Sequence, residues 1–403
     1  MSDALRLDIV TEASELARVA LRAGRAPKLA LDTEANGLFA FEARLCVVQL
    51  AWREDDRDVV AIVDALATPV DALAPLLDER GPTKILHDLT FDARLLAAAG
   101  LTLRRVGDTE VTARLLGRSS LGLASLLGGE LGIPLSKALQ RHDWSRRPLA
   151  SSHVEYLAGD VAHLLALDAR LEAEAAARDL LPEIACETAY KLETANGPEG
   201  DGRPPWARAK GSSDLDVVGR AVLRRLLTER DEIARAIDFP PFQVIGSREL
   251  VLVAARRPRT HDELIKVLGR WPAKFPNESR RLLGAVGAGI EDGEVPPEET
   301  RLAFPPPPPR LLSERRRRVE QSLGAWRRRE AATKGWAEQA VLPGHCSRDL
   351  AVALADADDD EARRDAIACI RGLGDRRREW FAGAWLELAR TILDAPAATP
   401  DAG

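Results

Sequence analysis

The sequence predicts an α/β domain, in which a mixed sheet is flanked by helices, followed by two all-α helical domains. Strand-like and helix-like segments alternate over the first 190 residues, and the later segments read as amphipathic helices. Two Gly/Pro-rich stretches, 193–213 and 293–310, separate these regions. A chain of 403 residues is long enough for two or three domains that each bury a core. The predicted domains are 1–195, 211–292 and 311–396.

The predicted strands are apolar runs bounded by turn residues. In chain order they are KLALDTEA (28–35), ARLCVVQLAW (43–52), RDVVAIVDA (57–65) and TKILHD (83–88). The first of them ends in a turn at Asn36-Gly37 and is expected to be central in the sheet.

The predicted helices show apolar residues with a period of 3.6 and carry recognisable end signals. They are TPVDALAPLLDERG (68–81), LTFDARLLAAAG (89–100), GDTEVTARLLG (107–117), GLASLLGGELG (122–132) and one long helix with serine caps at 151–179. Residues 1–20 also read as helical and acidic, which is unlike a secretory signal.

The C-terminal half reads as two helical blocks, 214–292 and 311–395, which are interpreted as weak copies of one unit. The linker between them contains five consecutive prolines, a composition that favours a stiff polyproline II segment.

Composition excludes several classes of protein. The chain is 45% hydrophobic and 30% charged, and its apolar runs fall short of the roughly 18 residues of a membrane span. The net charge of −6 leaves no overall nucleic-acid footprint, so any phosphate must be bound locally, through a basic patch or metal ions. The four cysteines include no CxxC pair, which predicts a reducing cytoplasm and no zinc site.

Acidic residues at three places form the candidate site. Asp32 and Glu34 lie two apart on a predicted strand, so their carboxylates point to one face. Asp92 begins a helix after a buried strand, where it could simply complement the helix dipole. Tyr156 and Asp160 are four residues apart, on one face of a late helix, and the chain has only two tyrosines.

These four candidate carboxylates (Asp32, Glu34, Asp92 and Asp160) require cations if they converge on one point. Hard oxygen ligands with no neighbouring His or Cys select Mg²⁺ or Mn²⁺ over zinc. A pair of such ions, roughly 4 Å apart, suits the attack of water on a phosphodiester.

LDTEANGL, HDLTFDARLL and YLAGDVAHLL resemble the three exonuclease motifs of the DEDD superfamily, in its tyrosine-bearing branch. The histidine-bearing branch would need His at the position of Glu155. The segment LSKALQRHDWSRRPLASSHVEYLAGD is similar to the one that leads into the third motif of the ribonuclease D family, and RDEIARAIDFPPFQVIGSREL resembles the HRDC domain.

The resemblance implies a ribonuclease-H-like fold for the first domain and HRDC-type folds for the helical domains. It implies that the four candidate carboxylates hold two divalent ions, Mg²⁺ or Mn²⁺, and that Tyr156 orients the attacking water, with Asp32 bridging both ions. The implied activity is 3′→5′ exoribonuclease trimming of tRNA precursors and other small structured RNAs, which releases nucleoside 5′-monophosphates. The expected protein is a cytoplasmic monomer with no membrane partner.

Substrate contacts are expected from residues near these motifs, and each has a structural alternative. Phe39 and Phe91 could stack on a terminal base or pack inside the protein. His87 could contact substrate or make a structural hydrogen bond. Lys137 and Arg147 could contact phosphates or order the loop beside the site.

Three further interpretations stay open from residues alone. The acids cannot distinguish RNA from DNA, so a 3′→5′ DNA exonuclease is the alternative enzyme, and a non-catalytic nucleic-acid-binding adaptor is the alternative class. A helicase is disfavoured because the chain has no GxxxxGK[ST] loop. The basic stretch 313–330 is either a solvated helix face or an RNA track in which Trp326 stacks on a base.

Overall fold

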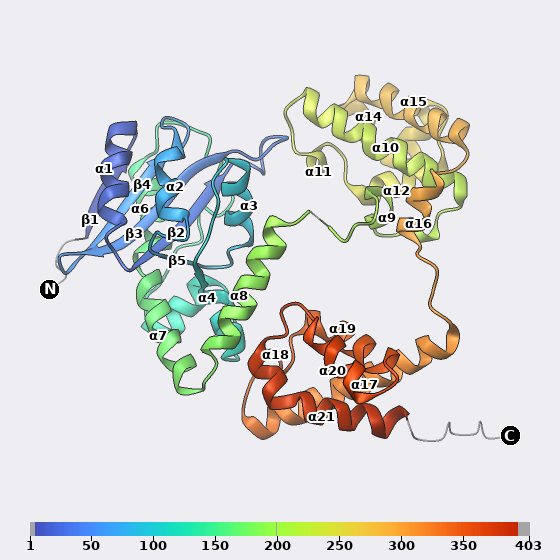
Figure 1. Ribbon diagram of the computed structural model, residues 1–403. Helices are drawn as coiled ribbons and strands as arrows, with labels where there is room; N and C mark the ends of the chain where they lie inside the picture. Colours follow the sequence, from blue (N-terminus) through green and yellow to red (C-terminus); the bar gives the residue numbers. More distant parts are fainter. Residues whose placement is uncertain (1–4, 199, 394–403) are drawn as a thin grey trace. The chain divides into compact units, whose positions relative to one another are not determined.

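The computed structural model describes residues 5–198 and 200–393, which pack into two compact units (Figure 1). One unit contains Met1–Glu34, Leu45–Gly197 and Pro307–Gly403, and the other contains Ala35–Arg44 and Pro198–Pro306. The three domain boundaries predicted from the linkers stay a prediction, and residues 1–4 and 394–396 of the outer domains lie outside the described residues.

The first unit is built on one six-stranded mixed sheet with the strand order β1-β4-β3-β2-β5-β6. The strands are β1 (Arg6–Val10), β2 (Lys28–Ala35), β3 (Leu45–Glu54), β4 (Arg57–Asp64), β5 (Thr83–Leu86) and β6 (Val106–Asp108). Strands β3 and β4 are antiparallel, whereas β1 is parallel to β4, and β5 is parallel to both β2 and β6. The predicted mixed sheet is thereby confirmed, and β2 is central in it.

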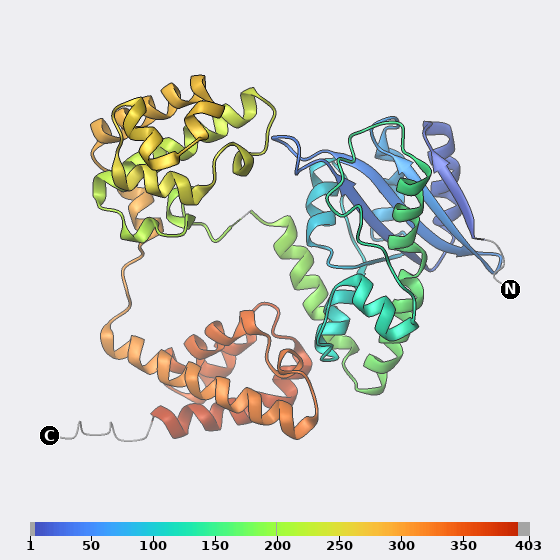
Figure 2. The ribbon, with the colours of Figure 1, turned by 180° about the vertical axis from the view of Figure 1, so that it is seen from behind.

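Helices cover both faces of this sheet (Figures 1 and 2). They are α1 (Ala13–Ala23), η1 (Val70–Leu73), α2 (Ala74–Leu77), α3 (Thr90–Ala98), α4 (Thr109–Leu115), α5 (Leu123–Leu126), η2 (Leu127–Leu131), α6 (Ser151–Ala162), α7 (Leu164–Ala177) and α8 (Leu181–Asn196). Every residue of β3 from Leu45 to Trp52 is buried, so this strand does not alternate between buried and exposed positions, and Gln49 is the polar residue within the run. Ala30 of β2 and Val47 of β3 pack with residues of α4, α6 and α7 in one core.

In the first unit the structure differs from the sequence predictions at residues 6–10, at 106–108, where strand β6 precedes the expected helix, and at 151–179. Residues 6–10, expected to be helical, form β1, because their backbone pairs with β4 at the edge of the sheet. The single helix expected at 151–179 is two helices, because the backbone leaves the helical conformation at His163 (φ −111°, ψ 1°). Its cap is also different: the Ala150 amide donates to Nδ1 of His153, and the serines lie inside the first turn.

The C-terminal part of the first unit is a bundle of α17 (Arg310–Lys334), α18 (Glu338–Val341), α19 (Gly344–Asp356), α20 (Asp360–Ala368) and α21 (Asp375–Leu393). Trp326 lies in its core, 9% exposed, with ring centroids 5.3 Å from Phe381 and 5.9 Å from Trp385. It is therefore a packing residue and not the stacking group considered for the basic stretch. An HRDC-type fold for this bundle stays a prediction.

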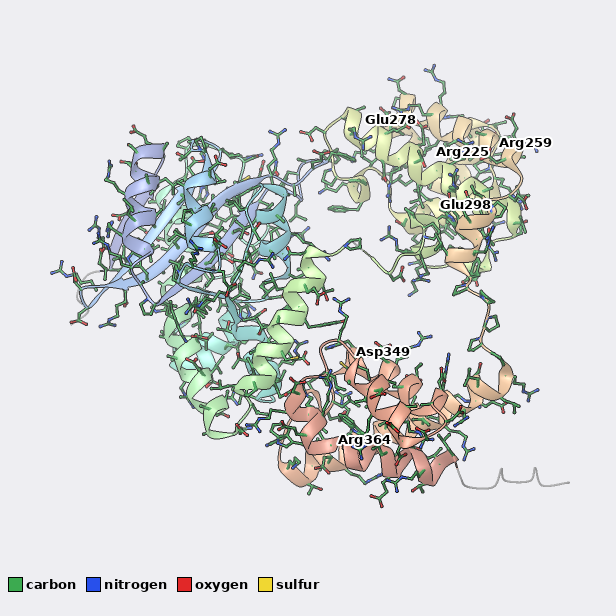
Figure 3. The ribbon with its side chains drawn as sticks, in the orientation of Figure 1. Arg225, Arg259, Glu278, Glu298, Asp349 and Arg364 are labelled. Atoms are coloured by element: carbon green, nitrogen blue, oxygen red, sulfur yellow. The ribbon has the colours of Figure 1, made fainter. Side chains whose placement is uncertain are left out.

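The second unit is helical and has its own core. Its elements are α9 (Pro205–Arg208), η3 (Ser212–Asp214), α10 (Val217–Ala236), α11 (Pro241–Val244), α12 (Ser247–Arg256), α13 (His261–Leu268), α14 (Trp271–Lys274), α15 (Pro276–Asp292) and α16 (Pro297–Ala303). The short helix α16 lies within the stretch predicted to be a linker, and Ala303 packs into the core. Charged side chains of both signs, such as Arg225 and Glu278, project from this unit (Figure 3).

Within the described residues, none of the helices is long and apolar enough to cross a membrane.

Candidate active site

Strand β2 carries two of the four candidate carboxylates into the middle of the sheet. Asp32 and Glu34 alternate with buried Leu31 and Thr33, so they share the face of Ala30, which packs against α6 and α7. Helix α6 lies on this face and carries Asp160, which is 9% exposed. The sheet face and the helix therefore bring acids from positions 32, 34 and 160 together.

The carboxylates of Asp32, Glu34 and Asp160 form a compact cluster, with one oxygen from each residue within 4.8 Å of the others. Burial raises the pKa of Asp32 to about 7, and burial together with the charge of Asp32 raises the pKa of Asp160 to about 8. For Glu34, burial and the Asp32, Asp160 and Asp92 carboxylates raise the pKa to about 9. These shifts measure the cost of holding like charges together out of water.

Asp92 joins the site from the first turn of α3, but its carboxylate lies outside that cluster of three oxygens. It is 4% exposed, and Oγ1 of Thr33 donates to its Oδ1 at 2.5 Å. Burial, followed by the charge of Asp32, raises its pKa well above the ordinary value, while Thr33 opposes the rise. Asp92 is thus electrostatically coupled to Asp32. Its carboxylate is held in place by Thr33, which lies on the same strand as Asp32.

The donor set fits a divalent cation. It consists of hard carboxylate oxygens from β2, α3 and α6, and Mg²⁺ or Mn²⁺ prefers such ligands. Besides burial, the carboxylates of Asp32, Asp160 and Asp92 raise the pKa of Glu34. A cation at this position would compensate both the burial that raises the three pKa values and the repulsion that adds to it at Glu34 and Asp160.

In the absence of divalent ions, the folded protein should lose stability as the pH rises from about 5 to 9. Unfolded carboxyls ionise near pH 4, but the pKa values of Asp32, Asp160 and Glu34 in the folded chain are raised to about 7, 8 and 9. The folded state therefore binds more protons in this interval. This contribution to stability is complete below pH about 4 and is lost as the pH rises through the folded pKa values.

Melting temperatures of chelator-treated protein across this range test that expectation. Added Mg²⁺ should raise the melting temperature more at pH 8 than at pH 5, because the ligands must be deprotonated to bind it. A metal-free melting temperature that climbs steadily towards pH 9 would contradict the clustered acids as the dominant titrating groups.

Tyr156 lies one helical turn before Asp160 and is half-buried. Burial, followed by the charges of Asp160, Glu34 and Asp32, raises the pKa of its hydroxyl, so the phenol stays protonated at neutral pH. The ring centroid lies 5.8 Å from that of Trp144, at an interplanar angle of 31°. Tyr156 therefore places an O–H group next to the acids and rests on a second aromatic ring.

The structure distributes the five expected substrate contacts among different environments. Phe91 is 53% exposed beside Asp92, and Phe39 is 39% exposed, in the segment Ala35–Arg44 of the second unit. Lys137 is exposed on the loop before α6. His87 makes a structural contact: its Nδ1 donates to Oγ1 of Thr109 at 2.9 Å, because that hydroxyl donates to the Leu86 carbonyl.

Arg147 is also used inside the protein, as a bidentate partner of Asp64, with Nε to Oδ2 at 2.5 Å and Nη2 to Oδ1 at 2.7 Å. Asp64 and Thr33 are residues of this neighbourhood that sequence reasoning did not select, whereas Trp144 was considered for ordering the loop or contacting phosphates. Trp144 belonged to the motif-like segment before α6, but Thr33 and Asp64 carry no local signal. Their partners are 59 and 83 residues away in the chain.

A second acidic group, formed by Asp88, Asp108 and Glu110, is neutralised by the protein itself. Lys191 of α8 places its Nζ 2.8 Å from Asp88, 2.8 Å from Asp108 and 2.9 Å from Glu110. Although burial opposes it, these acids raise the pKa of Lys191 above its ordinary value. The ammonium group occupies the position that a metal would need, so this group is a structural tie between α8 and the start of α3 and α4.

Comparisons with known proteins agree with this geometry. A family model for 3′-5′ exonucleases matches residues 7–176, and the model of the HRDC domain matches residues 219–286. The chain is 30% identical over 322 residues to the ribonuclease D of Pseudomonas paraeruginosa, covering 78% of this chain and 81% of that protein. It is 28% identical over 303 residues to the ribonuclease D of Sphingobium indicum, covering 73% and 76%.

The fold is shared with solved structures. The crystal structure of Escherichia coli RNase D superimposes with a TM-score of 0.70 at 23% identity, covering 98% of this chain and 100% of that one. The catalytic core of RRP6 from Trypanosoma brucei gives a TM-score of 0.60 at 22% identity, covering 72% and 81%.

Proposed function

This chain belongs to the ribonuclease D family, and from that membership we propose that its four candidate carboxylates form the metal site of a 3′→5′ exoribonuclease. The exoribonuclease activity itself follows from the family. The observation that supports this site is the cluster of three carboxylate oxygens within 4.8 Å on the central strand and α6.

We propose two divalent ions, Mg²⁺ or Mn²⁺, as the cofactors. Asp32, Glu34 and Asp160 would supply ligands from the cluster, and Asp92, whose Oδ1 accepts from Thr33, would complete the set. When bound, such ions lower the pKa of the attacking water and neutralise charge on the leaving 3′-oxygen. The positive charge of the ions suits this site, because a buried cluster of carboxylates is unfavourable without cations.

Tyr156 is proposed to hold the attacking water. Its raised pKa keeps the proton on Oη at neutral pH, so the hydroxyl can donate one hydrogen bond and accept another. A hydrogen bond from water to Oη would orient the oxygen lone pair towards the phosphorus. Positioned groups of this kind contribute about 10²- to 10⁴-fold to rate.

The proposed substrates are 3′ ends of tRNA precursors and other small structured RNAs, degraded to nucleoside 5′-monophosphates by a monomer. The proposed compartment is the cytoplasm, with which the free thiols of Cys186, Cys346 and Cys369 are compatible. The exposed Phe91 beside Asp92 is a candidate for stacking on the terminal base.

The test is degradation of one sequence made as RNA and as DNA, each labelled at either the 3′ or the 5′ end. With Mg²⁺, 3′-labelled RNA should release labelled mononucleotide at once, while 5′-labelled RNA shortens as a ladder. RNA should be degraded faster than DNA, and a chelator should stop both reactions. Internal cleavage of a circular RNA, or full activity in the chelator, would contradict the proposal.

A further inference from the structure

The loop between η2 and α6 is held by the guanidinium of Arg147. Besides its two bonds to Asp64, Arg147 donates from Nη1 to the carbonyls of Trp144 at 2.7 Å and Arg146 at 2.9 Å, and from Nη2 to the carbonyl of Cys46 at 3.0 Å. With Nε at 2.5 Å and Nη2 at 2.7 Å from the Asp64 oxygens, these make five bonds. A guanidinium has five N–H donors, so none is left for a phosphate.

Asp64 fixes the other end of this pair. It is the last residue of β4 and is 6% exposed, and its Oδ1 accepts from the amides of Leu66 at 3.0 Å and Ala67 at 3.2 Å. Burial alone would raise the pKa of Asp64, but the Arg147 hydrogen bond and charge hold it below the ordinary value. Asp64 is thus an ionised anchor in the sheet, out of reach of any substrate.

Trp144 connects this anchor to the active site. Its ring is 1% exposed, with a centroid 4.9 Å from His142, 5.9 Å from His153 and 5.8 Å from Tyr156. The Trp144 side chain also opposes the rise in the pKa of Glu34, although its buried Nε1 makes no hydrogen bond of good geometry with the described residues. Since Arg147 binds the carbonyl of Trp144, the position of this ring depends on Arg147.

We propose that the Arg147–Asp64 pair positions the catalytic tyrosine. The pair fixes Trp144, and the Trp144 ring packs beside Tyr156 and holds it in place. Arg147 then acts through Tyr156 and not on the RNA. The inference rests on the proposed role of Tyr156. A misplacement of about 1 Å in such a group is enough to lower the rate by about 10²-fold, so a small shift of the loop has a measurable consequence.

The first experiment compares Arg147→Lys with Asp64→Asn, and uses Arg146→Lys as the matched control. Lysine keeps the charge, but its three N–H donors belong to one nitrogen, so it cannot form the bidentate contact that the guanidinium makes with Asp64. Both test variants should lower kcat by about 10-fold or more, leaving KM and the salt dependence of RNA binding unchanged. Arg146, whose side chain is 75% exposed, should tolerate the same change. A raised KM with a shallower salt dependence for Arg147→Lys would mark it as a phosphate contact and overturn the proposal.

A double-mutant cycle separates positioning from general damage. Tyr156→Phe alone should lower kcat by about 10²-fold. If Arg147 acts through the Tyr156 hydroxyl, adding Arg147→Lys to Tyr156→Phe should cost less than about 2-fold more. A fully multiplicative loss would overturn the proposal. A Tyr156→Phe variant of normal kcat would instead refute the proposed role of Tyr156, whatever Arg147 does.

The third measurement needs no catalysis. Tyr156 and Tyr190 are the only tyrosines, so ¹³C-tyrosine labelling gives two sets of ring signals in the metal-free protein. Asp64→Asn, which keeps the carbonyl contacts of Arg147 and is the milder change, should shift the Tyr156 signals and leave those of Tyr190 in place. Unchanged Tyr156 signals in Asp64→Asn, or equal shifts at both tyrosines, would overturn the inference.

Discussion

Replacing Asp32 or Asp160 by asparagine should abolish RNA cleavage, lowering kcat by roughly 10³-fold or more, because bound metal ions supply several kcal/mol of transition-state stabilisation. The metal-free protein should nevertheless keep or increase its melting temperature. Each change removes one charge from a cluster whose oxygens lie within 4.8 Å of one another, and so relieves repulsion. Initial rates on a short 3′-labelled RNA and thermal unfolding in chelator measure the two effects.

Asp58→Asn is the control for this pair. Asp58 lies on β4, and its side chain is 62% exposed, so removal of its charge should leave both the rate and the melting temperature close to those of the unaltered protein. Most of the activity surviving in Asp32→Asn under Mg²⁺ would refute the metal site. Loss of activity together with a large fall in melting temperature would show that Asp32 serves the fold instead.

Arg377→Met should be the most destabilising single change predicted here, costing roughly 3–5 kcal/mol, the usual cost of breaking a buried ion pair from one side. Arg377 of α21 is fully buried, and its Nη1 lies 2.6 Å from Glu183 and 3.2 Å from Glu187, both on α8. Its remaining donors bind backbone carbonyls of the C-terminal bundle, such as that of Ala340 at 2.8 Å. Its loss would leave Glu183 and Glu187 buried without their ion-pair partner on α21.

The pH dependence of that loss is a further check. Burial already raises the pKa of Glu183 and Glu187, and Arg377 opposes the rise. Without it the two acids take up protons in the folded state, so the destabilisation should be smaller at pH 5 than at pH 8. Arg376→Met, which removes an exposed pair with Glu379, should change the free energy of unfolding by less than about 1 kcal/mol. Equal effects of the two variants would exclude a structural role for the buried network.

Local pattern was enough to place two pairs of candidate side chains. A two-residue spacing on a strand puts Asp32 and Glu34 on one face, and a four-residue spacing on a helix puts Tyr156 and Asp160 on another, whatever the rest of the chain does. The same reasoning was wrong at residues 6–10 and at His163. Residues 6–10 are extended because they pair with β4 at the edge of the sheet. At His163 the helical periodicity of the sequence continues across the point where the helix ends, so the pattern does not reveal the break.

Sequence by itself therefore determined the α/β class of the nuclease part, the helical character of the later segments, and that Asp32 and Glu34 share one face of a strand. Tertiary structure alone decided what the polar groups between those elements do. From the sequence, Arg147 could equally be a phosphate ligand or a residue that anchors the loop. The structure shows that its guanidinium binds Asp64, which is 83 residues away in the chain. Thr33 and Asp92 meet over 59 residues. Hydrogen-bond partners depend on which segments the fold makes neighbours, and spacing along the chain carries that information only within one strand or helix.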